Sequence, residues 1–344
     1  MLDFNEIQSL DSSTTAAGVF RYAMLKDLWV NFVDKLHAEY NEQYYTNQKM
    51  IAHIIYHDSK TFPDMIDIHE FMLTSVPRHI MKEIFKSMWI FYPILNIQKI
   101  VITYTDLTNL QAYKKYLPKY VDILVIQDCL IYDAKYLPKT SSLTFGVCNA
   151  LKTIHIDEDV KSLTLYTCGA VNFDEKDSLP NIESLNISRC IKCDTLPKLG
   201  KNCTLTMEHQ GFPKNAKGQS IKEAFISEYN DLVNCPDAKT LHIVNRDTTF
   251  FSYKYTSFNG ISDSVERLYV NQIDPLDFPI EETLPKKLEY LYLDGYYMRD
   301  KGYYDPTLYR WPNSMKEIEF GPNISQKYKK ILKNIFENTN VKIH

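Results

Sequence analysis

The amino-acid sequence predicts an α/β solenoid with a curved parallel sheet on its concave side, helices and loops on its convex side, and a helical cap at its N-terminal end. Three observations predict this fold: an apolar pattern that recurs along the chain, a cysteine or asparagine at a constant distance from that pattern, and a proline ahead of most of its copies. We therefore expect a helical cap in residues 1–95 and an irregular repeat array in residues 96–344.

The recurring pattern has apolar residues at its first, fourth and sixth positions, and it predicts one short strand in each repeat. Apolar residues at alternate positions mark a half-buried strand whose apolar side chains face the core. Copies that follow one another directly start 19 to 27 residues apart, a spacing typical of repeats that stack into a solenoid. The clearest copies start at Ile97, Val121, Val160, Ile182, Val265, Leu288 and Met315.

A cysteine or asparagine stands eight residues after the start of five copies, and this register predicts a structural ladder. The chain leaves the strand at that point, so we expect the side chain to lie inside the coil and to bond to backbone groups. The five residues are Cys129, Cys148, Cys168, Cys190 and Asn323. The combined pattern L-x-x-L-x-L-x-x-[NC] resembles leucine-rich repeats of the cysteine type.

Prolines precede the strands, because proline ends the helix of the convex side and holds the chain extended. They are Pro118, Pro138, Pro180, Pro236, Pro285 and Pro312. Two segments depart from the pattern. Residues 151–156 resemble a repeat but start too close to Val160, so we expect them on the convex side. The gap that holds residues 208–235 is too long for one coil, and Ile221 to Val233 carry a helix-like pattern, so we expect an insertion or an oversized repeat there.

Helical spacing of apolar residues predicts helices at both ends of the chain. In the N-terminal region it predicts three helices, over residues 20–36, 50–55 and 80–89. Near the C-terminus, apolar residues from Tyr328 to Phe336 share one helical face, and Ser325 is the expected N-cap. Val341 and Ile343 then close the array.

The N-terminal region also resembles part of an F-box. The stretch GVFRYAMLKDLWVNFVDKL (18–36) is similar to the second half of that motif, and residues 83–102 resemble the passage from F-box to first repeat in fungal F-box/leucine-rich-repeat proteins. The Leu-Pro opening of an F-box is missing before Phe20. The resemblance implies the substrate-recognition subunit of a cullin-type (SCF) ubiquitin ligase, which binds the Skp adaptor through Phe20, Leu28 and Trp29.

Composition argues against several other classes of protein. The formal net charge of −4 opposes a duplex-wide phosphate contact, although it is compatible with a local basic patch, so we do not expect a nucleic-acid partner. The chain contains no phosphate-binding loop, dinucleotide motif or H-E-x-x-H sequence, and we expect neither an enzyme nor a cofactor. No apolar run reaches membrane length, and the acidic N-terminus differs from a secretory signal. We therefore expect reduced cysteines and a cytoplasmic or nuclear location.

One set of residues has the composition of a zinc site: Cys190, Cys193, Cys203 and His209. Because Cys190 is already explained by the ladder, we favour ordinary repeat residues over a metal site. Cys193 falls outside the ladder register, so we expect it to tolerate serine.

The outward positions of the strands favour protein recognition on the concave face, because tyrosine combines apolar area with a hydroxyl and loses little entropy on binding. The residues expected to bind a partner there are Tyr166, Arg267, Tyr269, Tyr290 and Tyr292. The sequence thus predicts a protein–protein interaction module. Two alternatives stay open: a leucine-rich regulator of a GTPase, and a non-catalytic scaffold or a viral or parasite decoy.

Overall fold

The structure is a computed structural model, in which the chain forms two compact units. Unit 1 is Met1–Leu151 and unit 2 is Lys152–His344. The residues that the structure describes are 52–56, 66–76, 78–89, 95–154, 156–169, 171–174, 176–190, 193–227, 232–244, 260–271, 284–294 and 310–344.

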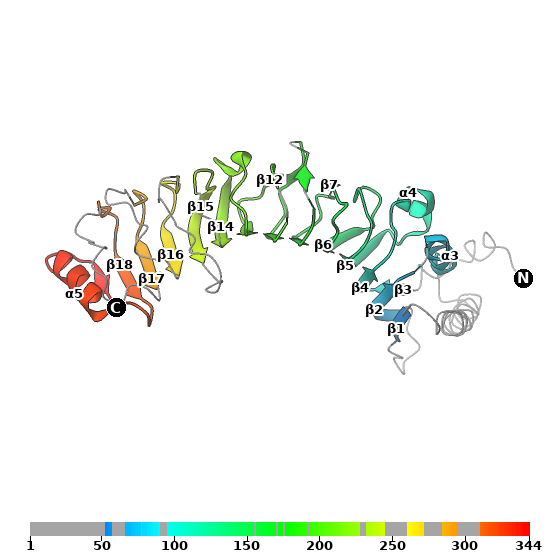
Figure 1. Cartoon of the computed structure of the whole chain (residues 1–344), viewed down its shortest axis with the longest axis horizontal. Coiled ribbons are helices and arrows are strands. Elements are labelled where there is room, and N and C mark those ends of the chain that lie inside the picture. Colours follow the sequence, from blue (N-terminus) through cyan, green and yellow to red (C-terminus); the bar gives the residue numbers. More distant parts are fainter. Residues whose placement is uncertain are drawn as a thin grey trace, which may run out of the picture. The chain divides into compact units, whose positions relative to one another are not determined.

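Unit 1 contains a sheet of order β1-β2-β4-β5-β6 (Figure 1). Strands β2, β4, β5 and β6 run parallel, whereas β1 pairs antiparallel with β2 and β3 adds a short parallel pairing to β2. The elements are β1 (Ala52–Tyr56), β2 (Ile66–Thr74), α3 (Arg78–Met88), β3 (Leu95–Ile97), β4 (Lys99–Thr103), α4 (Leu110–Tyr113), the 3-10 helix η1 (Lys114–Tyr116), β5 (Tyr120–Gln127) and β6 (Lys139–Gly146).

Two expectations for the N-terminal region are corrected by unit 1. The second expected helix, at 50–55, is wrong over its described residues, because residues 52–55 lie in strand β1. Antiparallel pairing with β2 there outweighs the local spacing of the isoleucines. The parallel sheet also starts before residue 95, since Phe71 of β2 is in register with Ile100 of β4. The helix expected at 80–89 is confirmed as α3. The helix expected at 20–36 and the F-box residues Phe20, Leu28 and Trp29 lie outside the described residues.

Unit 2 is a parallel β-solenoid whose main sheet has the order β8-β11-β13-β14-β15-β16-β17-β18-β19. Figure 1 shows β14 to β18 side by side, with helix α5 beside β18. The main strands are β8 (Ser162–Tyr166), β11 (Ser184–Ser188), β13 (Thr204–Glu208), β14 (Ser220–Ser227), β15 (Asp237–Val244), β16 (Arg267–Asn271), β17 (Tyr290–Asp294), β18 (Glu317–Phe320) and β19 (Lys342–Ile343).

Shorter elements connect the main strands of unit 2. They are β7 (Thr153–Ile154), which pairs with β9 (Asn172–Phe173), β10 (Ser178–Leu179), which pairs with β12 (Lys198–Leu199), the 3-10 helix η2 (Lys214–Ala216) and α5 (Gln326–Ile335). Residues 151–156 therefore contribute β7 outside the main sheet, as the sequence predicts. Helix α5 is also confirmed, and the Ser325 side chain accepts a hydrogen bond from the Tyr328 amide at 3.3 Å.

The core of unit 2 consists of rows of apolar side chains that the strand register brings together. Leu163, Leu185 and Leu205 occupy equivalent positions on adjacent strands and have no exposed surface. Each coil therefore buries its apolar residues against the next coil, which is how a stacked repeat stabilises itself. Among the described residues, no helix is both long and apolar enough to cross a membrane.

The expected insertion at 208–235 is wrong, because this segment contains a regular strand of the sheet. Strand β14 pairs in parallel with both β13 and β15. Its inward residues Ile221, Ala224 and Ile226 follow the same pattern as the other copies. Ala224 stands at the central inward position, where most other copies have leucine or isoleucine, so the apolar repeat pattern is weaker in this copy.

Candidate interaction surface

The outward side chains of unit 2 form a continuous surface on the main sheet, which we call the outer face. Successive side chains of a strand point to opposite sides, so these residues alternate with the buried ones. The central row of this face contains small polar residues on the first three strands and rings on the next four. In strand order the row is Thr164, Asn186, Thr206, Phe225, His242, Tyr269, Tyr292 and Glu319.

Four rings of the central row, Phe225, His242, Tyr269 and Tyr292, form what we call the aromatic row. The Phe225 and His242 rings stack with centroids 4.1 Å apart and an interplanar angle of 9°. His242 stacks in turn on Tyr269 at 4.3 Å and 7°, and Tyr269 lies 6.0 Å from Tyr292 in a tilted arrangement. This stacking follows from the register, because parallel strands place equivalent side chains about 4.8 Å apart.

Arg267 and Tyr290 support the aromatic row from the neighbouring outward positions. The Arg267 guanidinium carbon lies 4.3 Å from the centre of the Tyr290 ring, and its Nη2 donates to the Tyr269 hydroxyl at 3.2 Å. Tyr290 donates from its hydroxyl to the carboxylate of Glu319 and is only 8% exposed. Arg267 lies over the face of the Tyr290 ring and Glu319 accepts from its hydroxyl, so Tyr290 supports the row from the side. Its expected contact with a partner stays a prediction.

Burial, more than the neighbouring carboxylates, shifts the pKa values of the titratable side chains in and beside the aromatic row. His242 Nε2 lies 2.7 Å from Glu223 Oε1. Burial lowers the pKa of His242, and the Glu223 carboxylate opposes this shift without reversing it. Burial also raises the pKa values of Tyr290 and Tyr292, with added contributions from Glu319 at both and from Asp294 at Tyr292. The row is therefore a neutral aromatic surface with carboxylates at its margin.

The structure brings together four of the five predicted binding residues. Arg267, Tyr269, Tyr290 and Tyr292 occupy the adjacent strands β16 and β17. Tyr166, the last residue of β8, is three strands away from the aromatic row. Sequence reasoning missed Phe225, because β14 was interpreted as helical. The alternation of Ile221, Ala224 and Ile226 contains the information that would have identified it.

The four ladder cysteines lie in the coil interior as free, buried thiols. Cys129 Sγ donates to the Gln127 carbonyl at 3.2 Å and lies 3.4 Å from the Ile102 carbonyl of the preceding coil. Cys148 makes the equivalent contacts with Gly146 and Ile126 in unit 1, and Cys190 makes them with Ser188 and Leu165 in unit 2. These three thiols thus contact a carbonyl of their own coil and one of the preceding coil.

Two further side chains differ from the expected ladder. Asn323 is half-buried and donates from its amide nitrogens, main-chain and side-chain, to the Asp294 carboxylate at 3.1 and 3.3 Å. It therefore bonds to a neighbouring side chain at the place where the cysteines bond to carbonyls. Cys193 is only 6% exposed, and its thiol donates to the Thr195 carbonyl at 3.3 Å, so the expected tolerance of serine is withdrawn.

Within the described residues, no three His, Cys, Asp or Glu side chains gather closely enough to hold a metal ion. Cys190, Cys193 and Cys203 are each buried, and burial raises the pKa values of Cys193 and Cys203 to about 12. Comparison of the chain with protein-family models, curated proteins and solved structures gave no match.

Proposed function

We propose that unit 2 is a protein–protein interaction module whose aromatic row binds a partner. The observation that carries this proposal is the stack of half-buried rings from Phe225 to Tyr292 on four adjacent strands. Tyrosine and arginine are enriched at binding hot spots, where rings give apolar area and hydroxyls give direction. Pre-stacked rings add a further advantage, because they lose little conformational freedom when a partner covers them.

The surroundings of the aromatic row support side-chain recognition rather than pairing with an added strand. Each strand from β14 to β17 has a hydrogen-bonded neighbour on both sides, so its backbone groups are already paired. The row spans about 15 Å, or three strand spacings of about 4.8 Å each. Glu223, Glu319 and Asp294 form part of a polar margin around these rings. An apolar centre with a polar margin is the usual anatomy of an interface.

The test uses alanine variants of the two tyrosines of the aromatic row. We expect Tyr269→Ala and Tyr292→Ala each to weaken partner binding by about 1–3 kcal/mol without lowering the melting temperature. Binding is measured as quantitative recovery of the proteins that the full chain captures from cells. Thr164→Ala, in the same outward row on β8, is the matched control. Normal recovery with both tyrosine variants would exclude the aromatic row as the contact surface.

The finer form of the proposal is that the chain recognises substrates for a cullin-type ubiquitin ligase. Its support is the resemblance of residues 18–36 to part of an F-box, with Phe20, Leu28 and Trp29 as the adaptor-binding residues. We expect the full chain to co-purify with the Skp adaptor, and a chain starting near Asn47 to lose it. Tyr269→Ala should retain the adaptor, because it alters only the aromatic row. Equal adaptor recovery with the full and shortened chains would remove the ligase assignment.

A further inference from the structure

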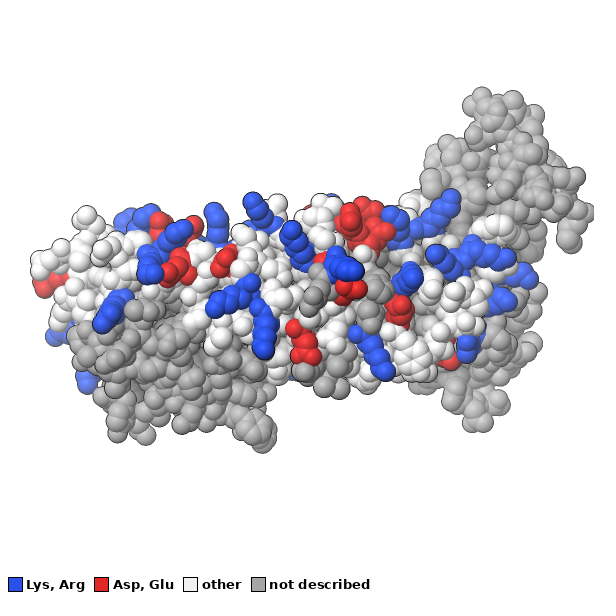
Figure 2. All heavy atoms as spheres, turned by 90° about the horizontal axis from the view of Figure 1, so that it is seen from above, with Lys and Arg blue, Asp and Glu red and all other residues white. Residues whose placement is uncertain are grey.

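Unit 1 carries a second surface, of opposite character, built from lysines and aromatic rings. Residues 78–139 contain nine Lys or Arg against five Asp or Glu, although the formal net charge of the whole chain is −4. Figure 2 shows these basic side chains gathered at the end of unit 1 that carries α3 and α4. We call it the lysine–aromatic surface, and its residues are Trp89, Lys114, Lys115, Tyr116, Lys119, Tyr120, Lys135, Tyr136 and Lys139.

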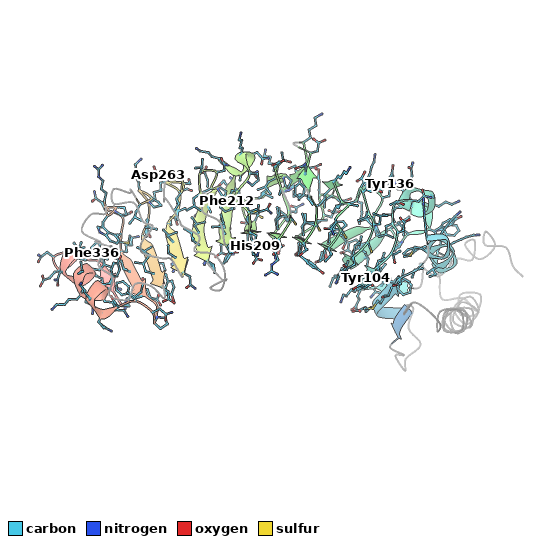
Figure 3. All side chains as sticks on the ribbon, viewed as in Figure 1. Tyr104, Tyr136, His209, Phe212, Asp263 and Phe336 are labelled. Atoms are coloured by element: carbon cyan, nitrogen blue, oxygen red, sulfur yellow. The ribbon has the colours of Figure 1, made fainter. Side chains whose placement is uncertain are left out.

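Close contacts hold the lysines against ring faces and join neighbouring coils. Lys114 Nζ lies 5.5 Å from the centre of the Tyr136 ring in the next coil, and Lys135 Nζ approaches the same ring at 5.7 Å. Lys115 lies 4.7 Å from the centre of the Tyr116 ring. The Tyr116 ring meets Trp89, at the end of α3, edge to face at 5.9 Å. Figure 3 shows Tyr136 beside α4, on the side of unit 1 away from Tyr104.

Four lysines of this surface carry a positive charge that no described carboxylate neutralises. Lys114, Lys115, Lys119 and Lys135 are exposed and make no ion pair with any described residue. Lys119 and Lys139 lie on adjacent coils, since the Lys139 amide donates to the Lys119 carbonyl at 3.2 Å. The nearby Asp133 carboxylate accepts from the Lys135 amide at 2.9 Å and leaves that ammonium group unpaired. Like charges held together in this way favour a polyanionic ligand.

Exposed rings between these lysines distinguish among polyanions. Tyr120 is 51% exposed and in register with Lys139, and Trp89 is 38% exposed. An acidic polypeptide offers carboxylates to the lysines but few flat groups to the rings. A single strand of nucleic acid offers a phosphate and a stacking base in every residue, which matches a surface that alternates lysines and rings.

We propose that the lysine–aromatic surface of unit 1 binds single-stranded nucleic acid, with the lysines on phosphates and with Tyr120 and Trp89 stacked on bases. This binding needs only a local patch, so it is compatible with the acidic net charge that opposed a duplex-wide contact. It is also independent of the aromatic row of unit 2, because the two surfaces share no residue.

The experiment measures the affinity of the full chain for a fluorescently labelled oligouridine across a range of salt concentrations. The triple variant Lys114→Glu, Lys115→Glu, Lys119→Glu should bind about tenfold more weakly or worse, with a salt slope smaller by about two, since each phosphate contact on a single strand contributes about 0.7. Its charge-matched control is Lys198→Glu, Lys217→Glu, Lys239→Glu, at exposed lysines of unit 2. Unchanged affinity in the first triple variant would overturn the proposal.

A second comparison separates base stacking from general attraction of anions. Tyr120→Ala should weaken oligouridine binding several-fold and leave binding of the base-free polyanion heparin unchanged. Tyr104→Ala, at a tyrosine that is 62% exposed on the other side of unit 1, should change neither. If polyglutamate binds as tightly as oligouridine, the surface binds acidic polypeptide and the nucleic-acid assignment is wrong. If Tyr120→Ala and Tyr104→Ala change oligouridine binding equally, Tyr120 does not stack on bases, and the nucleic-acid assignment is wrong as well.

Discussion

A residue in the left-handed backbone conformation follows most of the early strands, and it explains why the next residue is buried. In unit 1, Tyr104 has φ 52° and its amide donates to the Gln127 carbonyl at 3.1 Å. In unit 2, Thr167 has φ 52° and donates to Ser188 at 2.8 Å. The turn continues the ladder of hydrogen bonds while it directs the following side chain inward. Among the described residues, the non-glycine residues with this conformation are Ser75, Tyr104, Asp128, Val147, Thr167, Arg189 and His209.

These turns are strained, because the left-handed conformation costs about 1–2 kcal/mol for a residue with a Cβ. We expect Thr167→Gly to raise the free energy of unfolding by about 0.5–1 kcal/mol, after the larger entropy loss of glycine is subtracted. Thr167 is exposed, so the change removes no buried contact. The matched control is Thr164→Gly in β8, which should lower stability by about 0.5–1 kcal/mol. If urea unfolding shows that both variants change the free energy of unfolding in the same direction, the Thr167 turn is not strained.

The ladder cysteines test the interior of the coils. Cys168 Sγ lies 3.5 Å from the Tyr166 carbonyl and is 1% exposed. Cys168→Ser keeps a donor but adds desolvation, so we expect it to lower stability by about 1–2 kcal/mol. Cys193→Ser should have a similar cost, since that thiol is also buried and bonded to a carbonyl. Cys168→Asp should prevent folding, because an unpaired buried carboxylate costs far more than a neutral group.

Thiol labelling of the native protein gives a direct check of the same register. Burial keeps the labelling reagent away from Cys129 and Cys148. It also raises their pKa values to about 12 and about 11, so both thiols remain protonated at neutral pH. We expect neither to react at the rate of a free exposed thiol until the protein is unfolded. Cys190 is the exception in this ladder, since hydrogen bonding from Cys168 lowers its pKa. Fast native labelling of Cys129 or Cys148 would show that the proposed register is wrong.

At the scale of elements, the sequence predicts strands best where both inward positions carry large apolar residues. Strands β8 and β11 have leucine or isoleucine at both, and each was predicted in its correct register. Strand β14 was not, because Ala224 fills the central position and the flanking residues also suit a helix. Strand β1 was missed for a related reason, since its pairing with β2 is antiparallel and falls outside the repeat. The spacing of apolar residues within one segment does not predict which distant strand that segment pairs with.

In the aromatic row too, the sequence predicts which side chains face outward, whereas the contacts between them depend on the fold. Tyr269 and Tyr292 were predicted as surface residues from strand alternation alone. The continuous row in which Tyr292 meets Tyr269, Tyr269 stacks on His242 and His242 stacks on Phe225 follows from the register of four strands that lie apart in the sequence. The burial of Tyr290 beneath Arg267 depends on side-chain geometry, and no repeat pattern specifies it.

The stacking of His242 predicts a pH dependence. Its pKa in the folded chain is below the ordinary value of 6.5, chiefly through burial. Between that folded value and 6.5 the unfolded chain therefore binds more protons, so stability is full above 6.5 and falls as the pH drops. We expect urea unfolding to show a lower stability at mildly acidic pH than at neutral pH. His242→Phe keeps a ring in the stack without a titrating group, so this part of the pH dependence should be lost.

At the scale of unit 2, the sheet is a one-dimensional stack that needs a closed end. Helix α5 supplies it at the C-terminal side: Phe336 meets Trp311 edge to face at 5.0 Å, and Tyr328 meets Phe320 of β18 at 6.4 Å. The sequence predicted this helix, its N-cap and its apolar face, because all three are local features. The coils inside the stack have weaker local sequence signals than this helix, since their strands are stable only when neighbouring coils cover them.

This arrangement predicts that damage to α5 spreads inward from the C-terminal end. Leu332 has no exposed surface, so Leu332→Ala should lower stability by about 2–5 kcal/mol through the lost burial and the cavity. Because each coil depends mainly on its neighbours, hydrogen exchange should increase first in β18 and β17 and last in β8. Lys333→Ala, at an exposed position of the same helix, should leave the exchange pattern unchanged. An equal increase in every strand would instead show that unit 2 unfolds as a single cooperative block.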